Sequence, residues 1–284
     1  MQSRAIQVLS AALLCGLTGH AFGGLTLLSG ASPLSHAGNL VTNGSFEVGA
    51  PSPGSSIFWA NPSFPGNAVP AGWAATGQAS TYATWGSDPT PGTGLRGSAL
   101  LPDGNAGLYF GNQFTDVSVA PVQHPDGTVT FASAPTFTPA FGGPCTLTQT
   151  VNTQLTPSAA YRISFWVSGE DAGVAGNGWQ RGVMGFQMTN VLSGDPIQYL
   201  SVPSGTGTIH SRVYTFQFSP INASLPVDIT FINWGHVASI GGVPSGLATE
   251  LVLDDVIINP VAAPAPGGMA LLGVCGLALR RRRA

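Results

Sequence analysis

Apolar and polar residues alternate with a period of two in four segments of the second half of the chain. In residues 161–169, YRISFWVSG, the apolar positions Tyr161, Ile163, Phe165 and Val167 alternate with more polar ones. Segments 182–191, 210–220 and 227–235 show the same pattern. Successive side chains of a strand point to opposite faces. Each segment therefore predicts a strand with one buried face and one more polar face.

The rest of the central region favours the same class of fold. Residues 51–138 are rich in proline and glycine and contain only short strand-like pieces, and few segments of the chain have a helical pattern. A sheet that is apolar on one face must bury that face against a second layer. We therefore expect an all-β fold, a two-sheet antiparallel β-sandwich.

The two ends of the chain have a different pattern. Arg4 precedes an apolar run and a group of small residues, which predicts a secretory signal peptide over residues 1–23 and hence export. The alternative is a buried helix. At the other end, residues 269–279 are apolar and four arginines follow. This run is shorter than the roughly 20 residues that span a bilayer, so we expect only a transient stay in the inner membrane. A permanent C-terminal anchor is the alternative.

Charge and cysteine content narrow the function. The 284 residues contain no lysine and have a formal net charge of −3, which gives no support for a nucleic-acid partner. Cys15 and Cys275 lie in the two terminal segments, so a processed chain keeps only Cys145. One cysteine can form neither an internal disulfide nor a cysteine zinc site.

The C-terminal segment resembles a known sorting signal. Pro264-Ala265-Pro266, the apolar run and the terminal arginines follow the layout of the PEP-CTERM signal of Gram-negative bacteria, with Ala265 in the place of the usual glutamate. The resemblance implies that residues 261–284 are a sorting segment and that an exosortase-type protease processes it.

Residues 39–260 resemble the galactose-binding-like jelly roll, a fold shared by many carbohydrate-binding modules. NLVTNGSFEVG opens this region at residue 39 and ELVLDDVIINP closes it at residue 260. The resemblance implies a jelly-roll domain whose first and last strands are neighbours. It also implies a structural Ca²⁺ held by an early glutamate and a late aspartate, here Glu47 with Asp254 and Asp255.

Strand alternation assigns these two aspartates to opposite faces. Asp254 is expected on the apolar face with Val256 and Ile258, and Asp255 is expected to point outward. A carboxylate on a buried face needs a partner, and Ca²⁺ accepts six to eight oxygen ligands. The alternative is that these carboxylates accept hydrogen bonds from backbone amides or arginines without a metal.

Tryptophans are the candidate ligand contacts, because aromatic rings stack on sugar rings. Trp166 is expected on the polar face of its strand beside Arg162, and Trp179 lies in a glycine-containing loop with Arg181. We therefore predict ligand binding by these two tryptophans and two arginines. Packing in the core is the alternative for each tryptophan.

Motifs for catalysis are not evident. The chain has no Gly-x-Ser-x-Gly sequence and its histidines lack metal-ligand spacing. We therefore expect a non-catalytic exported protein of the cell surface or extracellular matrix, one that binds polysaccharide or exopolysaccharide or has a structural role in the envelope or biofilm. The alternative is a secreted polysaccharide-active hydrolase with an unrecognised site, for which Glu170 and Asp171 are the candidate acids.

Overall fold

Within the part of the chain that the computed structural model describes, every regular element is a strand. No helix that could cross a lipid bilayer occurs in these ranges. The expected signal peptide and nearly all of the expected sorting segment lie outside them, as do the candidate residues Glu170, Asp171 and Trp179. The described residues are 24–48, 58–60, 70–76, 82–86, 102, 106–110, 114–139, 144–151, 155–156, 159–169, 181–203, 211–222, 224–234, 236–240, 243–247 and 251–261.

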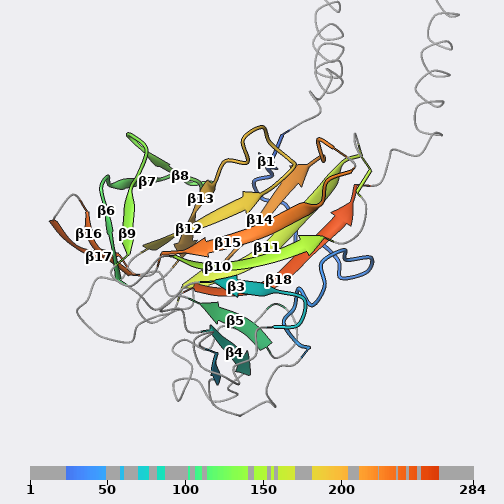
Figure 1. The fold of residues 1–284 in the computed structure, drawn as a ribbon, viewed down its shortest axis with the longest axis horizontal. Helices are drawn as coiled ribbons and strands as arrows, with labels where there is room; N and C mark the ends of the chain where they lie inside the picture. The colour runs from blue at the N-terminus through green and yellow to red at the C-terminus, as the bar shows by residue number, and fades with distance from the viewer. Residues whose placement is uncertain are drawn as a thin grey trace, which may run out of the picture.

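Two antiparallel sheets form the body of the fold, which confirms the predicted all-β class. Strands β10, β12 and β15 of the five-stranded sheet run side by side in Figure 1. The seven-stranded sheet has the order β1 (Thr26–Leu27), β14 (Ser211–Phe218), β11 (Tyr161–Gly169), β18 (Leu251–Pro260), β5 (Ala106–Phe110), β4 (Tyr82–Gly86) and β2 (Phe58–Ala60). The five-stranded sheet has the order β13 (Gln198–Pro203), β12 (Arg181–Met188), β15 (Val227–Asn233), β10 (Cys145–Val151) and β3 (Ala74–Thr76).

Two smaller sheets gather at one end of these strands, on the left in Figure 1. The hairpin of β7 and β8 is fixed to β13 because Gly127 O accepts hydrogen bonds from Ser201 N at 2.8 Å and Tyr214 Oη at 3.1 Å. The four-stranded sheet contains one parallel pair, β6 with β16. Its strands are β17 (Val243–Leu247), β16 (His236–Ile240), β6 (Phe114–Val117) and β9 (Phe137–Pro139), and the hairpin strands are β7 (Pro121–Gln123) and β8 (Val129–Phe131).

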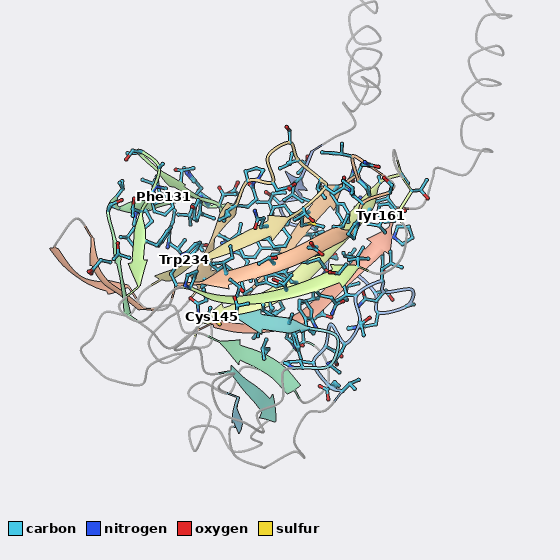
Figure 2. All side chains as sticks on the ribbon, in the orientation of Figure 1. Phe131, Cys145, Tyr161 and Trp234 are labelled. Atoms are coloured by element: carbon cyan, nitrogen blue, oxygen red, sulfur yellow. The ribbon has the colours of Figure 1, made fainter. Side chains whose placement is uncertain are left out.

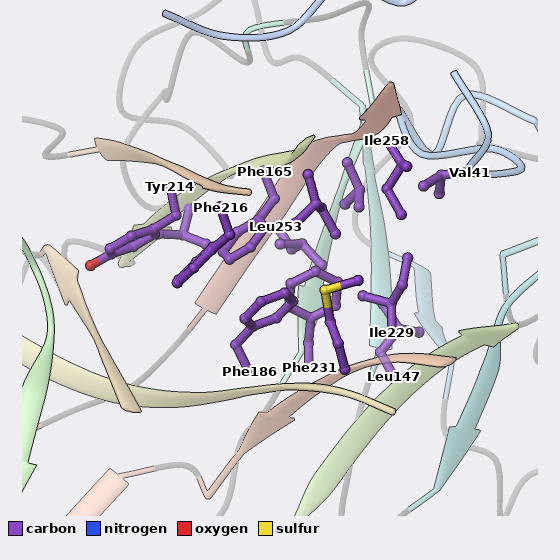
Figure 3. Packing of buried hydrophobic residues seen from close by; sticks show 14 of the residues in the cluster. Val41, Leu147, Phe165, Phe186, Tyr214, Phe216, Ile229, Phe231, Leu253 and Ile258 are labelled. Atoms are coloured by element: carbon purple, nitrogen blue, oxygen red, sulfur yellow. The ribbon is translucent and has the colours of Figure 1, made fainter. Parts of the chain in front are cut away.

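The core lies between the two large sheets, and aromatic rings join them (Figure 3). The ring of Phe165 in β11 lies 4.8 Å from that of Phe186 in β12 and 5.0 Å from that of Phe231 in β15, measured between centroids. All three side chains are fully buried. The predicted apolar face of β11 is thus confirmed, since Tyr161, Ile163, Phe165 and Val167 all belong to this core.

The N-terminal segment, residues 24–48, packs on β18 near the other end of the chain. Leu40 N donates to Ile258 O at 3.0 Å, and Val256 N donates to Gly44 O at 2.9 Å. The side chain of Asn39 donates to Val256 O and accepts from Ile258 N. The expected contact between the opening and closing segments is therefore confirmed, although residues 39–48 form turns rather than a strand.

Candidate functional site

A β-bulge in β18 decides where its two aspartates lie. Ser164 of β11 pairs with Ile257, but Trp166 pairs with Asp254, so β18 has one extra residue between these pairs. A bulge of this kind moves the following side chains to the opposite face. Asp254 therefore shares the outer face of the seven-stranded sheet with Trp166. The expectation that Asp254 lies on the core face with Val256 is wrong for this reason.

Both aspartates are buried, so Asp255, which was expected to point outward, is not exposed to solvent. Asp254 is 0% exposed, and its Oδ1 accepts a hydrogen bond from Asp255 N at 2.7 Å. Asp255 is 6% exposed and has a positive φ of 56°. Its Oδ1 lies 2.6 Å from Nε2 of His36, which comes from the N-terminal segment. Strand β18 thus carries two adjacent aspartates that are buried instead of exposed to solvent.

The chemistry of this place fits a calcium ion only in part. The hydrogen bond between Val256 and Gly44 joins the two segments that carry Asp255 and Glu47, and carboxylates are suitable ligands for Ca²⁺. However, no three His, Cys, Asp or Glu side chains in the described ranges lie close enough to hold a metal together. A calcium ion here would need further oxygen ligands, such as backbone carbonyls, and its presence stays a prediction.

Of the two predicted sugar-binding tryptophans, the one that the structure describes, Trp166, does not provide an exposed ring. Trp166 is only 5% exposed, which leaves no ring face for a sugar and corrects that prediction. Arg162 is half-buried in the same strand, opposite Asn259 of β18 and Gln217 of β14. Arg181 begins β12, but its side chain lies outside the described part of the structure, like the whole of Trp179.

Four aromatic side chains form a cluster on the outer side of the five-stranded sheet. Figure 2 labels Phe131 and Trp234 of this cluster. The rings of Phe137 and Trp234 stack with centroids 4.0 Å apart, and Trp234 lies against Gly185 of β12. Tyr199 of β13 is 5.0 Å from Phe131 and 5.9 Å from Phe137. Trp234 is buried, whereas the other three rings are half-buried and present surface to solvent.

Hydroxyl groups cover the neighbouring outer surface of β3, β10 and β15, which we call the hydroxyl face. Thr148 and Thr230 are hydrogen-bonded across the strands at 3.0 Å, and Thr150 donates to Oδ1 of Asp228 at 2.6 Å. These cross-strand bonds hold the side chains in fixed positions. The hydroxyl face comprises Thr76, Thr146, Thr148, Thr150, Asp228 and Thr230.

Together the cluster and the hydroxyl face offer two kinds of contact on one side of the protein. Aromatic rings bind the apolar faces of sugar rings, and rigid hydroxyls exchange hydrogen bonds with sugar hydroxyls. Burial raises the pKa of Tyr199, so its phenol remains a neutral hydrogen-bond donor. Alternation in 227–235 already separates Asp228, Thr230 and Trp234 from the core positions. The sequence did not indicate Phe131, Phe137 or Tyr199, because they come from short, irregularly spaced strands.

Comparisons with known proteins do not assign the chain to a family. No protein-family model matches the sequence, and no curated protein matches it. A solved cyclase from Fischerella sp. TAU is 13% identical, with a TM-score of 0.42 over 85% of this chain and 100% of the cyclase. Likenesses this distant establish neither a family nor an activity for this chain.

Two further solved structures are comparably distant. The CBM22-1 xylan-binding domain of Paenibacillus barcinonensis Xyn10C is 14% identical, with a TM-score of 0.34 over 68% of this chain and 88% of that domain. The enzymatically active domain of bacteriophage CBA120 tailspike protein 4 is 12% identical, with a TM-score of 0.37 over 80% of this chain. This chain spans only 22% of the tailspike chain.

Proposed function

We propose that this chain is an exported, non-catalytic protein of the cell surface or extracellular matrix that binds polysaccharide through the outer side of its five-stranded sheet. The observation that carries the proposal is the partly exposed side chain of Tyr199, together with Phe131 and Phe137, on the same side as the hydroxyl face. An extended glycan needs such a surface, with apolar rings and fixed polar groups on one side. A role in the envelope or biofilm matrix would follow from binding of this kind to exopolysaccharide.

Substitution of Tyr199 by alanine should weaken polysaccharide binding by about tenfold, or ~1.4 kcal/mol, because a stacking ring is lost. Affinity electrophoresis of the full-length protein in gels containing a panel of polysaccharides measures this. Ile221→Ala is the matched control, since Ile221 is 54% exposed in the turn between β14 and β15. Trp179→Ala tests the tryptophan that the structure does not describe. If Tyr199→Ala is retarded as strongly as the parent in every gel, this surface is not the binding site.

The described acidic residues of this chain do not favour the alternative of a polysaccharide-active hydrolase. Retaining and inverting glycosidases both use two acids placed on either side of the scissile bond. In the described ranges, the adjacent acids Asp254 and Asp255 are buried on the other large sheet. Glu170 and Asp171 lie outside these ranges, and no described feature of the site supports a catalytic role.

We also propose that the sorting segment is removed after export by an exosortase-type protease, after a transient stay in the membrane. The support is the order of the proline motif, the short apolar run and the arginines Arg280–Arg283. The expected result is an intact mass, for protein isolated from its native host, that lacks both the first 23 residues and the four terminal arginines. A mass that retains Arg280–Arg283 would contradict processing and support a permanent anchor.

A further inference from the structure

Without the two expected terminal segments, the domain is strongly acidic. Residues 24–261 contain all 12 acidic residues of the chain, no lysine and four arginines, so this part has a formal net charge of −8. The whole chain is less acidic, at −3, only because Arg4 and Arg280–Arg283 lie in the terminal segments. A domain with this charge repels polyanions and attracts polycations over roughly one Debye length, about 8 Å at physiological salt.

Negative charge on the hydroxyl face comes from a single residue. Strands β3, β10 and β15 contain one acidic or basic side chain, Asp228. Its Oδ1 accepts from Thr150, and its backbone is fixed by Thr189, whose N and Oγ1 bond Asp228 O and Asp228 N at 3.1 and 2.9 Å. Its Oδ2 forms no hydrogen bond or ion pair with the described residues and stays available to a ligand.

Within the described part of the chain, arginine side chains do not neutralise this carboxylate; Arg96, the fourth arginine of the domain, lies outside that part. Arg162 belongs to the other large sheet, and Arg212 donates to Pro125 O at the β7–β8 turn. Arg181 begins β12, whereas the residue facing Asp228 is Thr189, beyond the end of that strand. Along the strand, Arg181 is about 26 Å from Thr189 at ~3.3 Å per residue, which is about three Debye lengths at physiological salt.

We propose that the polysaccharide bound by the hydroxyl face carries protonated amino groups, as in a de-N-acetylated amino-sugar polymer, and that Asp228 is the counter-ion of one of them. This inference rests on the proposed polysaccharide-binding function and names its ligand class. An ammonium group donates hydrogen bonds but cannot accept them, which suits a carboxylate oxygen with an open lone pair. Uronic acid and sulfated polymers are disfavoured by the same charge.

The test compares two sugar hexamers that differ at the nitrogen on C2, which is a protonated amine in one and a neutral acetamide in the other. The probes are β-1,4-linked hexamers of glucosamine and of N-acetylglucosamine, titrated calorimetrically into the full-length protein at low salt and at a pH that protonates the free amines. We expect the glucosamine hexamer to bind more tightly, and Asp228→Asn to lower its affinity about fivefold, the upper range for an exposed ion pair. Affinity for the N-acetylated hexamer should not change, and added salt should reduce the difference between the hexamers.

Asp126→Asn is the control variant, because it changes the net charge equally. Asp126 is an exposed aspartate whose Oδ1 also accepts from a threonine hydroxyl, Thr128 Oγ1 at 2.7 Å, but it lies in the β7–β8 turn. Equal losses in the Asp126 and Asp228 variants would show that only net charge attracts the polymer, which overturns the proposal. Equal affinities for both hexamers, or binding of neither, would also overturn it. The polysaccharide-binding function would still stand if Tyr199→Ala weakened binding to a neutral glycan.

Discussion

Replacement of Gly44 by alanine should lower the free energy of unfolding by about 3–5 kcal/mol, a loss large enough to leave little stability in a typical domain. A Cβ atom on residue 44 would overlap the carbonyl oxygen of Val256. The same two residues share a backbone hydrogen bond of 2.9 Å, so neither segment can move aside without breaking it. Urea unfolding followed by tryptophan fluorescence measures the loss.

Gly24→Ala is the matched control for this substitution. A Cβ on Gly24 would meet no atom within 4 Å, and its backbone is not in the left-handed region. The control should change stability by less than about 0.5 kcal/mol. A Gly44→Ala protein as stable as the parent would show that residues 39–46 do not pack on β18 in solution.

Addition of calcium to metal-free protein should raise its melting temperature by several degrees, and a chelator should reverse the rise. We propose a structural Ca²⁺ beside β18 because two adjacent buried carboxylates, Asp254 and Asp255, disfavour their charged forms unless a cation offsets them. His36 belongs to the same place, with its Nε2 2.6 Å from Oδ1 of Asp255. A metal that binds only the folded state stabilises it by about 2.7 kcal/mol at a hundredfold excess over its dissociation constant.

Substitutions separate this site from general effects of charge. Glu47→Gln or Asp254→Asn should abolish the response to calcium, and each keeps a side-chain oxygen that can accept a hydrogen bond. Asp228→Asn should keep the response, because Asp228 lies on the other large sheet. If neither calcium nor chelator changes the melting temperature, the carboxylates of β18 act as hydrogen-bond acceptors only.

The fold was predictable from the sequence where strands are long and alternate strictly. The core faces of β11, β12, β14 and β15 follow from a period of two, because a one-residue shift would expose the whole apolar set. The face of Asp254 could not be predicted in this way. The bulge at Asp255 depends on the pairing with β11, which involves residues distant in sequence.

The candidate site was less predictable than the fold. Its aromatic rings come from β8, β9, β13 and the residue after β15. Phe131 lies on the β7–β8 hairpin, which is fixed to β13 through Gly127. Patterns in a single sequence do not indicate that aromatic residues from such distant segments come together. They also suggested Trp166 as a ligand contact, because a polar face of a strand does not reveal whether other segments cover it.

The contact between the N-terminal segment and β18 also governs when the domain can finish folding. Asn39 and Ile258 are 219 residues apart, so at a synthesis rate of about 5–20 residues per second the partner of Asn39 appears roughly 10–40 s later. Contacts of such long range make folding slow. The chain therefore cannot complete this contact until almost all of it has been made, a delay that would suit the export proposed above.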